Sequence, residues 1–304
     1  MPSPSWRAAA RDLGSLVALL LLALLLRLPR LDSIPRYTDE TGEVATALDI
    51  AFEGARPLVH NDAYRGPVWA YGLAGALRLF GPQPGLPRRY ALTLSVLTVL
   101  ATWALARGLV GPRAGWVAGL LQASAFAPIA LESHVAWSNH ATPLVVTLAA
   151  LATWRGAGAS VTDPQPAPAE APVSGRQAPG FDSGHPVSGP ATGRQGPGGG
   201  ADRWLLLAGL LWGLALQTHP SVVAPLAGAG LWLLLRPGFR ARLRRPAPYL
   251  ALGLFLLALG PLIVHNLSSL RSTGDLASVE DATAESQPVN RDFGVASLAG
   301  NLVA

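Results

Sequence analysis

Long apolar runs separated by short polar or basic segments dominate the chain. Seven of them are candidates for membrane-spanning helices, and they lie at 13–32, 89–109, 114–131, 137–154, 203–219, 221–236 and 247–265. A helix needs about 20 apolar residues to cross about 30 Å of hydrocarbon, so the shorter runs require flanking small residues to extend them. The pattern predicts an all-α fold: a polytopic transmembrane helix bundle with about seven spans.

An eighth apolar run, at 66–80, lies between the first and second predicted spans. As a helix its 15 residues would measure about 22 Å, which is short for a span. It also contains Arg78 near its end. We therefore expect an interfacial or re-entrant helix.

A second helix is predicted in the same loop, 33–88. Thr38, Asp39 and Glu40 have the form of a helix start, with Thr38 as the cap and acidic residues in the first turn. A short amphipathic helix over 40–53 would place Val44, Ala47, Leu48 and Phe52 on one face. The loop is thus expected to hold amphipathic juxtamembrane helices.

Arginine positions predict the orientation of the bundle. The loop 236–246 carries five Arg in eleven residues, and Arg7 and Arg11 precede the first run. Both segments should be cytoplasmic, which places an even number of spans between them and the C-terminal tail outside. Arg27, near the end of the first run, is expected to snorkel to the far interface. Arg88 and Arg89 fall on the outer side and fit this topology least well.

The first run also has the charges and apolar core of a cleaved signal peptide. It ends in Arg27, Pro29 and Arg30, however, and not in a small-x-small cleavage site. We therefore interpret it as an uncleaved span. The Arg-only, Ala-, Gly- and Pro-rich composition indicates a GC-rich bacterium, so we expect a multi-pass protein of the bacterial cytoplasmic (inner) membrane.

Segment 155–202 differs in composition, with 11 Gly and 8 Pro in 48 residues and no Leu or Ile. It is predicted to be a disordered cytoplasmic linker. It separates an N-terminal membrane part, 1–154, with four spans from 203–265 with three further spans. Residues 266–304 would form an outer loop or tail. Because Ala304 follows soon after the last predicted span, we expect this sequence to be part of a longer polytopic protein.

Composition excludes several chemistries. Half of the residues are hydrophobic and 13% are charged. Soluble domains have about 25% charged residues. All 23 basic residues are Arg, so P-loop and Schiff-base lysines are absent. The chain has no Cys, which excludes disulfides, thiol nucleophiles and thiolate metal sites. Because the arginines are spread over short loops, the net charge of +5 does not indicate nucleic-acid binding.

The acidic residues concentrate in the first outer loop, where 32–62 holds seven of the 18 Asp and Glu. Two interpretations of Asp39 and Glu40 are open. They favour a helix N-terminus, or one of them is a catalytic carboxylate that accepts a proton from an acceptor hydroxyl.

Several short motifs, in their order along the chain, resemble the N-terminal part of the GT-C superfamily of membrane glycosyltransferases. The resemblance is closest to the bacterial branch that is similar to protein O-mannosyltransferases and lipid A aminoarabinose transferases. It covers most of 10–275 apart from the linker, and the order of the motifs is more specific than any one of them. The motifs are Tyr37-Thr38-Asp39-Glu40, Tyr64-Arg65-Gly66-Pro67, Phe80-Gly81, Arg89, Gly111-Pro112-Arg113-Ala114, the run from Ser133 to Trp137, the run from Gly213 to Pro220, Pro261 and His265-Asn266.

The resemblance implies inverting transfer of a sugar from a polyprenyl-phosphate donor to a hydroxyl of a lipid, glycan or protein acceptor at the outer membrane face. Asp39 would act as the base with support from Glu40, and Arg65 beside Tyr64 would bind the donor phosphate. A guanidinium suits bidentate phosphate binding. His134, Asn139 and His219 are expected to bind substrate in the same cavity. No cofactor is implied beyond compatibility with a divalent metal ion, and the other expected partners are membrane lipids.

The sequence departs from this family in the second outer loop. The family often has an Arg and then an acid before the fourth span. Here His134 stands near the Arg place and Ser138-Asn139-His140 occupies the acidic one, with Glu132 as the nearby carboxylate. Two other functions therefore stay open: a transporter or lipid flippase, and a catalytically inactive membrane scaffold. The absence of mid-span acids weighs against ion-coupled transport.

Overall fold

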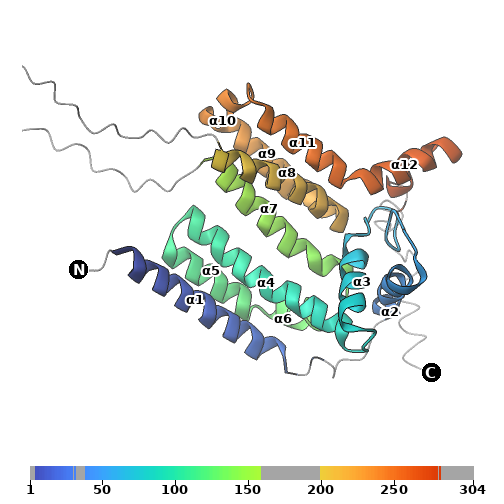
Figure 1. Cartoon of the computed structure of the whole chain (residues 1–304), viewed down its shortest axis with the longest axis horizontal. Coiled ribbons are helices and arrows are strands. Elements are labelled where there is room, and N and C mark those ends of the chain that lie inside the picture. The colour runs from blue at the N-terminus through green and yellow to red at the C-terminus, as the bar shows by residue number, and fades with distance from the viewer. Residues whose placement is uncertain (1–3, 30, 32–37, 159–198, 280, 282–304) are drawn as a thin grey trace, which may run out of the picture.

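A computed structural model describes residues 4–29, 31, 38–158, 199–279 and 281, and the described chain is all-α. The longer helices run roughly parallel to one another (Figure 1). They are α1 (Pro4–Arg27), α4 (Leu86–Leu109), α5 (Pro112–Ser124), α7 (Thr142–Gly156), α8 (Gly199–Thr218), α9 (Val223–Leu235) and α11 (Pro246–Ala258). In space α1 packs on α4 and α5, α4 on α7, α7 on α8, and α8 on α11.

Shorter elements gather at one end of the helix bundle, which we call the α2–α3 end (Figure 1). They are α2 (Thr38–Leu48), η1 (Asp49–Glu53), α3 (Val68–Phe80), α6 (Phe126–Ala130), η2 (Ser138–Ala141), η3 (Pro220–Val222) and α12 (Gly260–Ser272). The other end, which we call the arginine end, holds α10 (Pro237–Arg242), the start of α8 and the ends of α4 and α7.

Small residues let the helices approach closely. Where α7 meets α8, the buried core includes Ala149, Ala152, Ala208 and Ala215. On the other side of α8, a Cβ at Gly209 would lie 2.0 Å from the carbonyl oxygen of Ala251 in α11. The α8–α11 contact therefore requires glycine at this position.

Two helices are long and apolar enough to cross a membrane, Ala9–Arg27 and Leu86–Leu109. A third candidate is the pair α11 and α12, if this pair, bent by 60°, forms one span. The prediction of about seven spans is therefore wrong for the described residues. Most of the remaining apolar runs are interrupted by Pro, Gly or polar residues and form helices of 13 to 15 residues, about 20 Å long. Helix α8 has 20 residues, but Asp202, Arg203 and Gln217 lower its mean hydropathy.

The helix predicted over 40–53 exists as α2 and η1, and most of its predicted apolar face is buried. Ala47 is fully buried and Val44 and Leu48 are partly buried, whereas Phe52 is 55% exposed. The reason is the π-helical turn Asp49–Glu53, since its wider i→i+5 spacing changes the helical register. Helix α3 lies within the predicted run 66–80 and buries Trp69, Leu73 and Leu77 on one face. Its interfacial or re-entrant position stays a prediction.

The predicted linker 155–202 falls mainly on residues 159–198, which lie outside the described residues. Its described ends are helical, because α7 continues to Gly156 and α8 begins at Gly199. The predicted end of the last apolar run at 265 is also too early, since α12 continues to Ser272. Of the predicted tail 266–304, residue 280 and residues 282–304 lie outside the described part.

Arg27 does not snorkel to an interface. Its side chain is fully buried between α1, α4 and α5. The Nε atom donates to Ser95 Oγ at 3.0 Å, and Nη1 and Nη2 donate to the carbonyls of Ala123 and Gln122 at 2.7 and 3.0 Å. The guanidinium ties three helices together, because a buried charged donor has to be hydrogen-bonded.

Candidate functional site

Two glutamates on the buried side of α2 define a polar site at the α2–α3 end. Glu40 and Glu43 are 4% and 1% exposed. Their i, i+3 spacing places them on one helix face, followed one turn later by the buried Ala47. This face packs against the segment 133–141, which precedes α7 and includes η2.

Glu40 forms a closed ion pair with Arg88 at the start of α4. Arg88 Nε and Nη2 each donate to a carboxylate oxygen of Glu40 at 2.9 Å. Arg88 Nη1 donates to the Leu31 carbonyl at 3.1 Å, and the backbone N–H of Ala136 donates to Glu40 at 3.2 Å. This two-point geometry is the strong form of an Arg–carboxylate pair. It explains why Arg88 lies at this end despite its poor fit to the predicted topology.

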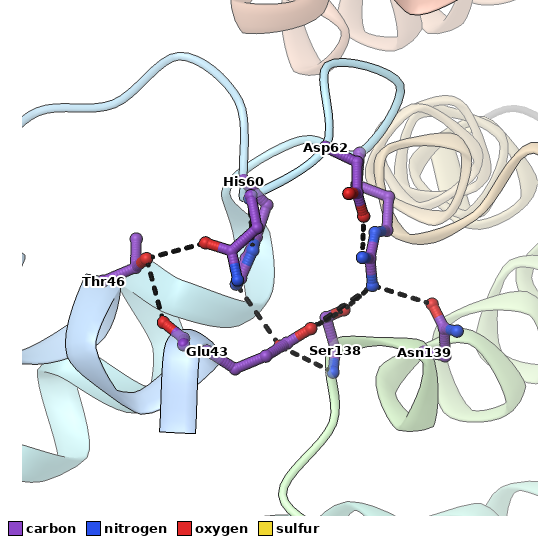
Figure 2. A network of polar contacts seen from close by, with 9 residues as sticks. Glu43, Thr46, His60, Asp62, Ser138 and Asn139 are labelled. Carbon is purple, nitrogen blue, oxygen red and sulfur yellow. Dashed lines mark hydrogen bonds and ion pairs between the residues drawn. The ribbon is translucent and has the colours of Figure 1, made fainter. Parts of the chain in front are cut away.

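Glu43 stands at the centre of a second, mixed network (Figure 2). It accepts from the backbone N–H and the hydroxyl of Ser138, both at 2.8 Å, and from Arg65 Nη1 at 3.3 Å. His60 Nε2 lies 3.3 Å from Oε2 of Glu43. The network therefore joins α2, the loop before α3, and η2.

Arg65 is held by groups from both loops. Its Nη1 also donates to Ser138 Oγ at 2.6 Å and to Asn139 Oδ1 at 3.5 Å, and its Nη2 pairs with Asp62. Within the described residues its buried Nε–H has no hydrogen-bond partner.

The loop that carries Arg65 is fixed at both ends. The N–H of His60 donates to the Arg65 carbonyl at 2.8 Å, and the N–H of Gly66 donates to the Gln217 carbonyl at the end of α8 at 2.7 Å. A Cβ at Gly66 would lie 2.2 Å from the Gln217 side chain. Glycine is therefore required for this loop to dock on α8.

His60 is neutral in this network. Its Nδ1 accepts from the N–H of Asn61 at 2.6 Å, which leaves the proton on Nε2, facing Glu43. Burial and then the charge of Arg65 lower the pKa of His60 to about 4, outweighing the carboxylate beside it.

The sequence-predicted site residues are only partly brought together. Arg65, Tyr64 and Asn139 meet, with the Arg65 guanidinium 5.6 Å from the centre of the Tyr64 ring. The His219 ring packs edge-on against Tyr64 at 6.4 Å. His219 Nδ1 accepts from the N–H of Ser221 and so caps η3.

Glu40 belongs to the neighbouring ion pair with Arg88. Asp39 lies in the first turn of α2, and its side chain is outside the described part of the structure. Its role as a base therefore stays a prediction.

His134 lies between backbone carbonyls of two segments, and its predicted substrate contact stays a prediction. Its Nδ1 lies 2.6 Å from the Ile129 carbonyl and its Nε2 lies 3.1 Å from the Pro29 carbonyl. These contacts tie the loop after α6 to the end of α1. Further along the same segment, Ser138 donates to Glu43 of α2.

Glu132, considered above as a compensating acid, lies apart from the Glu43 network. Burial raises the pKa of its carboxyl, and the charge of Arg27 opposes this rise. Its Oε2 atom is buried without a hydrogen-bond partner among the described residues. Its charge relation is therefore to Arg27 and not to Arg65.

An apolar groove of about 660 Å³ adjoins the polar site. It lies between η3, the start of α9 and the α11–α12 bend. Tyr64 lines it, together with Leu216, Pro220, Val223, Leu259, Leu262, Ile263, Asn266, Leu267, Ser278 and Val279. The Arg65 guanidinium does not itself line the groove, but it lies 5.6 Å from the centre of the Tyr64 ring. Among the described residues, no group of three or more His, Asp or Glu is arranged to hold a metal ion.

Sequence reasoning missed Glu43, His60 and Asp62 as members of the site. A usable signal existed for Glu43, since it lies one helical turn after Glu40 and before Ala47. The contacts of His60 and Asp62 depend on the fold of the loop 60–66, for which the sequence has no local signal.

Comparisons with protein-family models, curated proteins and solved structures found no match to this chain. The site combines paired carboxylates, a buried guanidinium with a spare donor, and an adjacent apolar groove.

Proposed function

We propose that the protein is a membrane glycosyltransferase of the GT-C type that transfers a sugar from a polyprenyl phosphate to an acceptor hydroxyl. The observation that carries the proposal is the position of Arg65. It is buried among Glu43, Asp62 and Ser138 and is adjacent in sequence to Tyr64, which lines the apolar groove.

Arg65 supplies the charge that a phosphate leaving group requires. A guanidinium binds phosphate oxygens through directed, charge-assisted hydrogen bonds. Its Nε–H has no partner within the described structure, and Glu43 and Asp62 hold the rest of the group in place. In the proposal Arg65 therefore faces the donor phosphate.

The groove supplies a place for the donor's isoprenoid chain. Its walls are mainly aliphatic, from Leu216, Val223 and Ile263, so burial of an apolar chain there is favourable by about 25 cal/mol for each Å² removed from water. The groove lies against the bent pair α11 and α12, which is a candidate membrane span if the pair forms one span, and this would allow a lipid donor to enter from the bilayer.

The proposed reaction is a single inverting displacement. The acceptor oxygen forms a bond to the anomeric carbon of the sugar while the bond from that carbon to the phosphate oxygen breaks. The acceptor proton passes to the carboxylate of Asp39, acting as the base. The bonding electrons leave with the polyprenyl phosphate, whose charge Arg65 stabilises. Glu40 and Glu43 are already paired within the site, and their role is to position α2 and Arg65.

The proposal is tested by sugar transfer in detergent-solubilised membranes, with a panel of labelled polyprenyl-phosphate sugars. Asp39→Asn should abolish transfer. The control is Asp49→Asn, which makes the same change at an exposed residue at the start of η1. This control should keep the wild-type rate. Both proteins are compared at equal abundance.

The outcomes separate the alternatives. Equal transfer by wild type and Asp39→Asn would show that Asp39 is not the base. Absence of transfer by the wild type, together with flipping of polyprenyl phosphate in liposomes, would replace the transferase by a lipid transporter. Absence of both activities would favour an inactive scaffold.

A further inference from the structure

The arginine end of the bundle holds a second cavity, of about 620 Å³. It lies where the ends of α4 and α7 meet the start of α8 (Figure 1), far along the helices from the Arg65 site. Its lining consists of Trp103, Ala104, Arg107, Gly108, Trp154, Arg155, Gly158, Gly200, Ala201 and Trp204. Three indole rings and two guanidinium groups thus surround one space.

The two arginines are held in place by aromatic rings. The Arg155 guanidinium lies 4.5 Å from the centre of the Trp204 ring, and that of Arg107 lies 5.7 Å from the Trp103 ring. Stacking fixes a guanidinium while leaving its N–H groups free to donate in the plane.

The arginines differ in their remaining contacts. Arg107 forms an ion pair with Asp12 of α1. Among the described residues, no hydrogen bond or ion pair engages the guanidinium of Arg155. Arg155 therefore offers an oriented positive charge beside the cavity.

The start of α8 adds a second source of positive potential. Gly200 and Ala201 line the cavity and belong to the first turn of a 20-residue helix. The first backbone N–H groups of a helix have no partner within it, and the helix dipole favours an anion there. Asp202 in the same turn does not line the cavity.

The surroundings are strongly basic. Among residues with described side chains, the arginine end carries Arg11, Arg107, Arg113, Arg155, Arg203, Arg236, Arg240, Arg242, Arg244 and Arg245, against Asp12 and Asp202. Such a field concentrates anions near the cavity. Basic pockets between membrane helices bind anionic lipid headgroups, and tryptophan is enriched at the headgroup level.

We infer that this cavity binds a phosphate ester anion through Arg155 and the first turn of α8, with the indole rings enclosing the attached group. An anionic phospholipid headgroup and a soluble phosphoester present the same chemistry. The site is separate from the Arg65 site and does not depend on sugar transfer.

The test measures ligand affinity of the purified full-length chain in detergent by native mass spectrometry. The ligands are phosphatidylglycerol, zwitterionic phosphatidylcholine and glycerol 3-phosphate. Arg155→Gln should weaken binding of the anionic phosphate ester about tenfold, because a charge-assisted contact is lost.

Arg236→Gln is the matched control. Arg236 lies at the same end and also stacks on a tryptophan, at 4.5 Å from the Trp232 ring, but it does not line the cavity. The Arg236→Gln variant removes the same charge and the same kind of stack. It should leave the affinity for the anionic phosphate ester within about twofold of the wild-type value.

A second pair of variants probes the cavity from α8. A Cβ at Gly200 meets no atom within 4 Å, so both Gly200→Glu and Gly200→Gln have room. The glutamate should abolish phosphate binding by repulsion, while the neutral glutamine should retain more of it.

Loss of phosphatidylglycerol binding in Arg155→Gln identifies a lipid headgroup, and the same loss for glycerol 3-phosphate identifies a soluble phosphoester. Either result supports the site. Equal effects of Arg155→Gln and Arg236→Gln, or no anion binding by the wild type, would overturn it, since binding would then reflect net charge or be absent.

Discussion

Two arginines at one end of the bundle and two at the other are held in opposite ways. At the α2–α3 end, Arg65 and Arg88 are 8% and 4% exposed and are paired with glutamates. At the arginine end, Arg155 and Arg236 are exposed and rest on indole rings. A guanidinium removed from water needs a carboxylate or several acceptors, whereas an exposed one keeps its hydration. Burial therefore decides which arginines are part of the architecture.

The comparison also separates arginines whose donors are engaged within the fold from arginines with an unpaired donor. Arg88 has its main donors engaged by Glu40 and a backbone carbonyl, so it stabilises the fold. Arg65 is nearly as buried but keeps a free Nε–H, and Arg155 keeps its whole guanidinium edge. These two residues are the ones from which ligand binding is inferred.

The largest expected effect is on stability at the α2–α3 end. Arg88→Gln leaves the Glu40 carboxylate buried without its charged partner, which should lower the free energy of unfolding by about 3–5 kcal/mol. Arg89→Gln changes the adjacent, exposed arginine and should stay within about 0.5 kcal/mol. The measurement is unfolding in detergent followed by tryptophan fluorescence. Similar effects of the two variants would mean that the buried pair contributes no more than a surface charge.

The next effect is a pH dependence centred on His60. Its pKa of about 4 in the folded protein is below the 6.5 of an unfolded chain, so the unfolded state takes up a proton first as the pH falls. The stabilising contribution is complete above pH 6.5 and is lost progressively toward pH 4. It amounts to about 3 kcal/mol at most.

His60→Gln isolates this contribution. The difference in unfolding free energy between wild type and His60→Gln should shrink as the pH is lowered from 7 to 4. Unfolding measured at a series of pH values tests this. A constant difference across that range would show that His60 does not take part in the acid sensitivity.

Helix positions were predictable from the sequence because they follow local rules. Apolar runs located the helices, including the run 66–80 that contains α3. The number of spans was not predictable from apolar runs alone, since the ends of the helices are set by Pro, Gly and polar residues within or beside those runs. The π-turn that exposes Phe52 left no local signal.

The site was predictable only as far as its local motifs. Tyr64-Arg65 and Asn139 were identified and do meet. Glu43, His60 and Asp62 join them through contacts between segments distant in sequence, which depend on how the loop 60–66 docks on α8. His134 was predicted from its place in the loop, but its ring nitrogens are taken by backbone carbonyls.

The smallest expected effect tests the exposed side of the comparison. The stack of Arg155 on Trp204 should contribute about 0.5–1 kcal/mol to the unfolding free energy, as exposed cation–π contacts do. A double-mutant cycle with Arg155→Gln and Trp204→Leu measures this coupling, and the cycle of Arg236→Gln with Trp232→Leu provides its match. The two couplings should be similar, because the stacking distances are equal. A coupling above about 2 kcal/mol for Arg155 alone would place it with the buried, architectural arginines, and its role in binding a phosphate ester would then have to be separated from its role in folding.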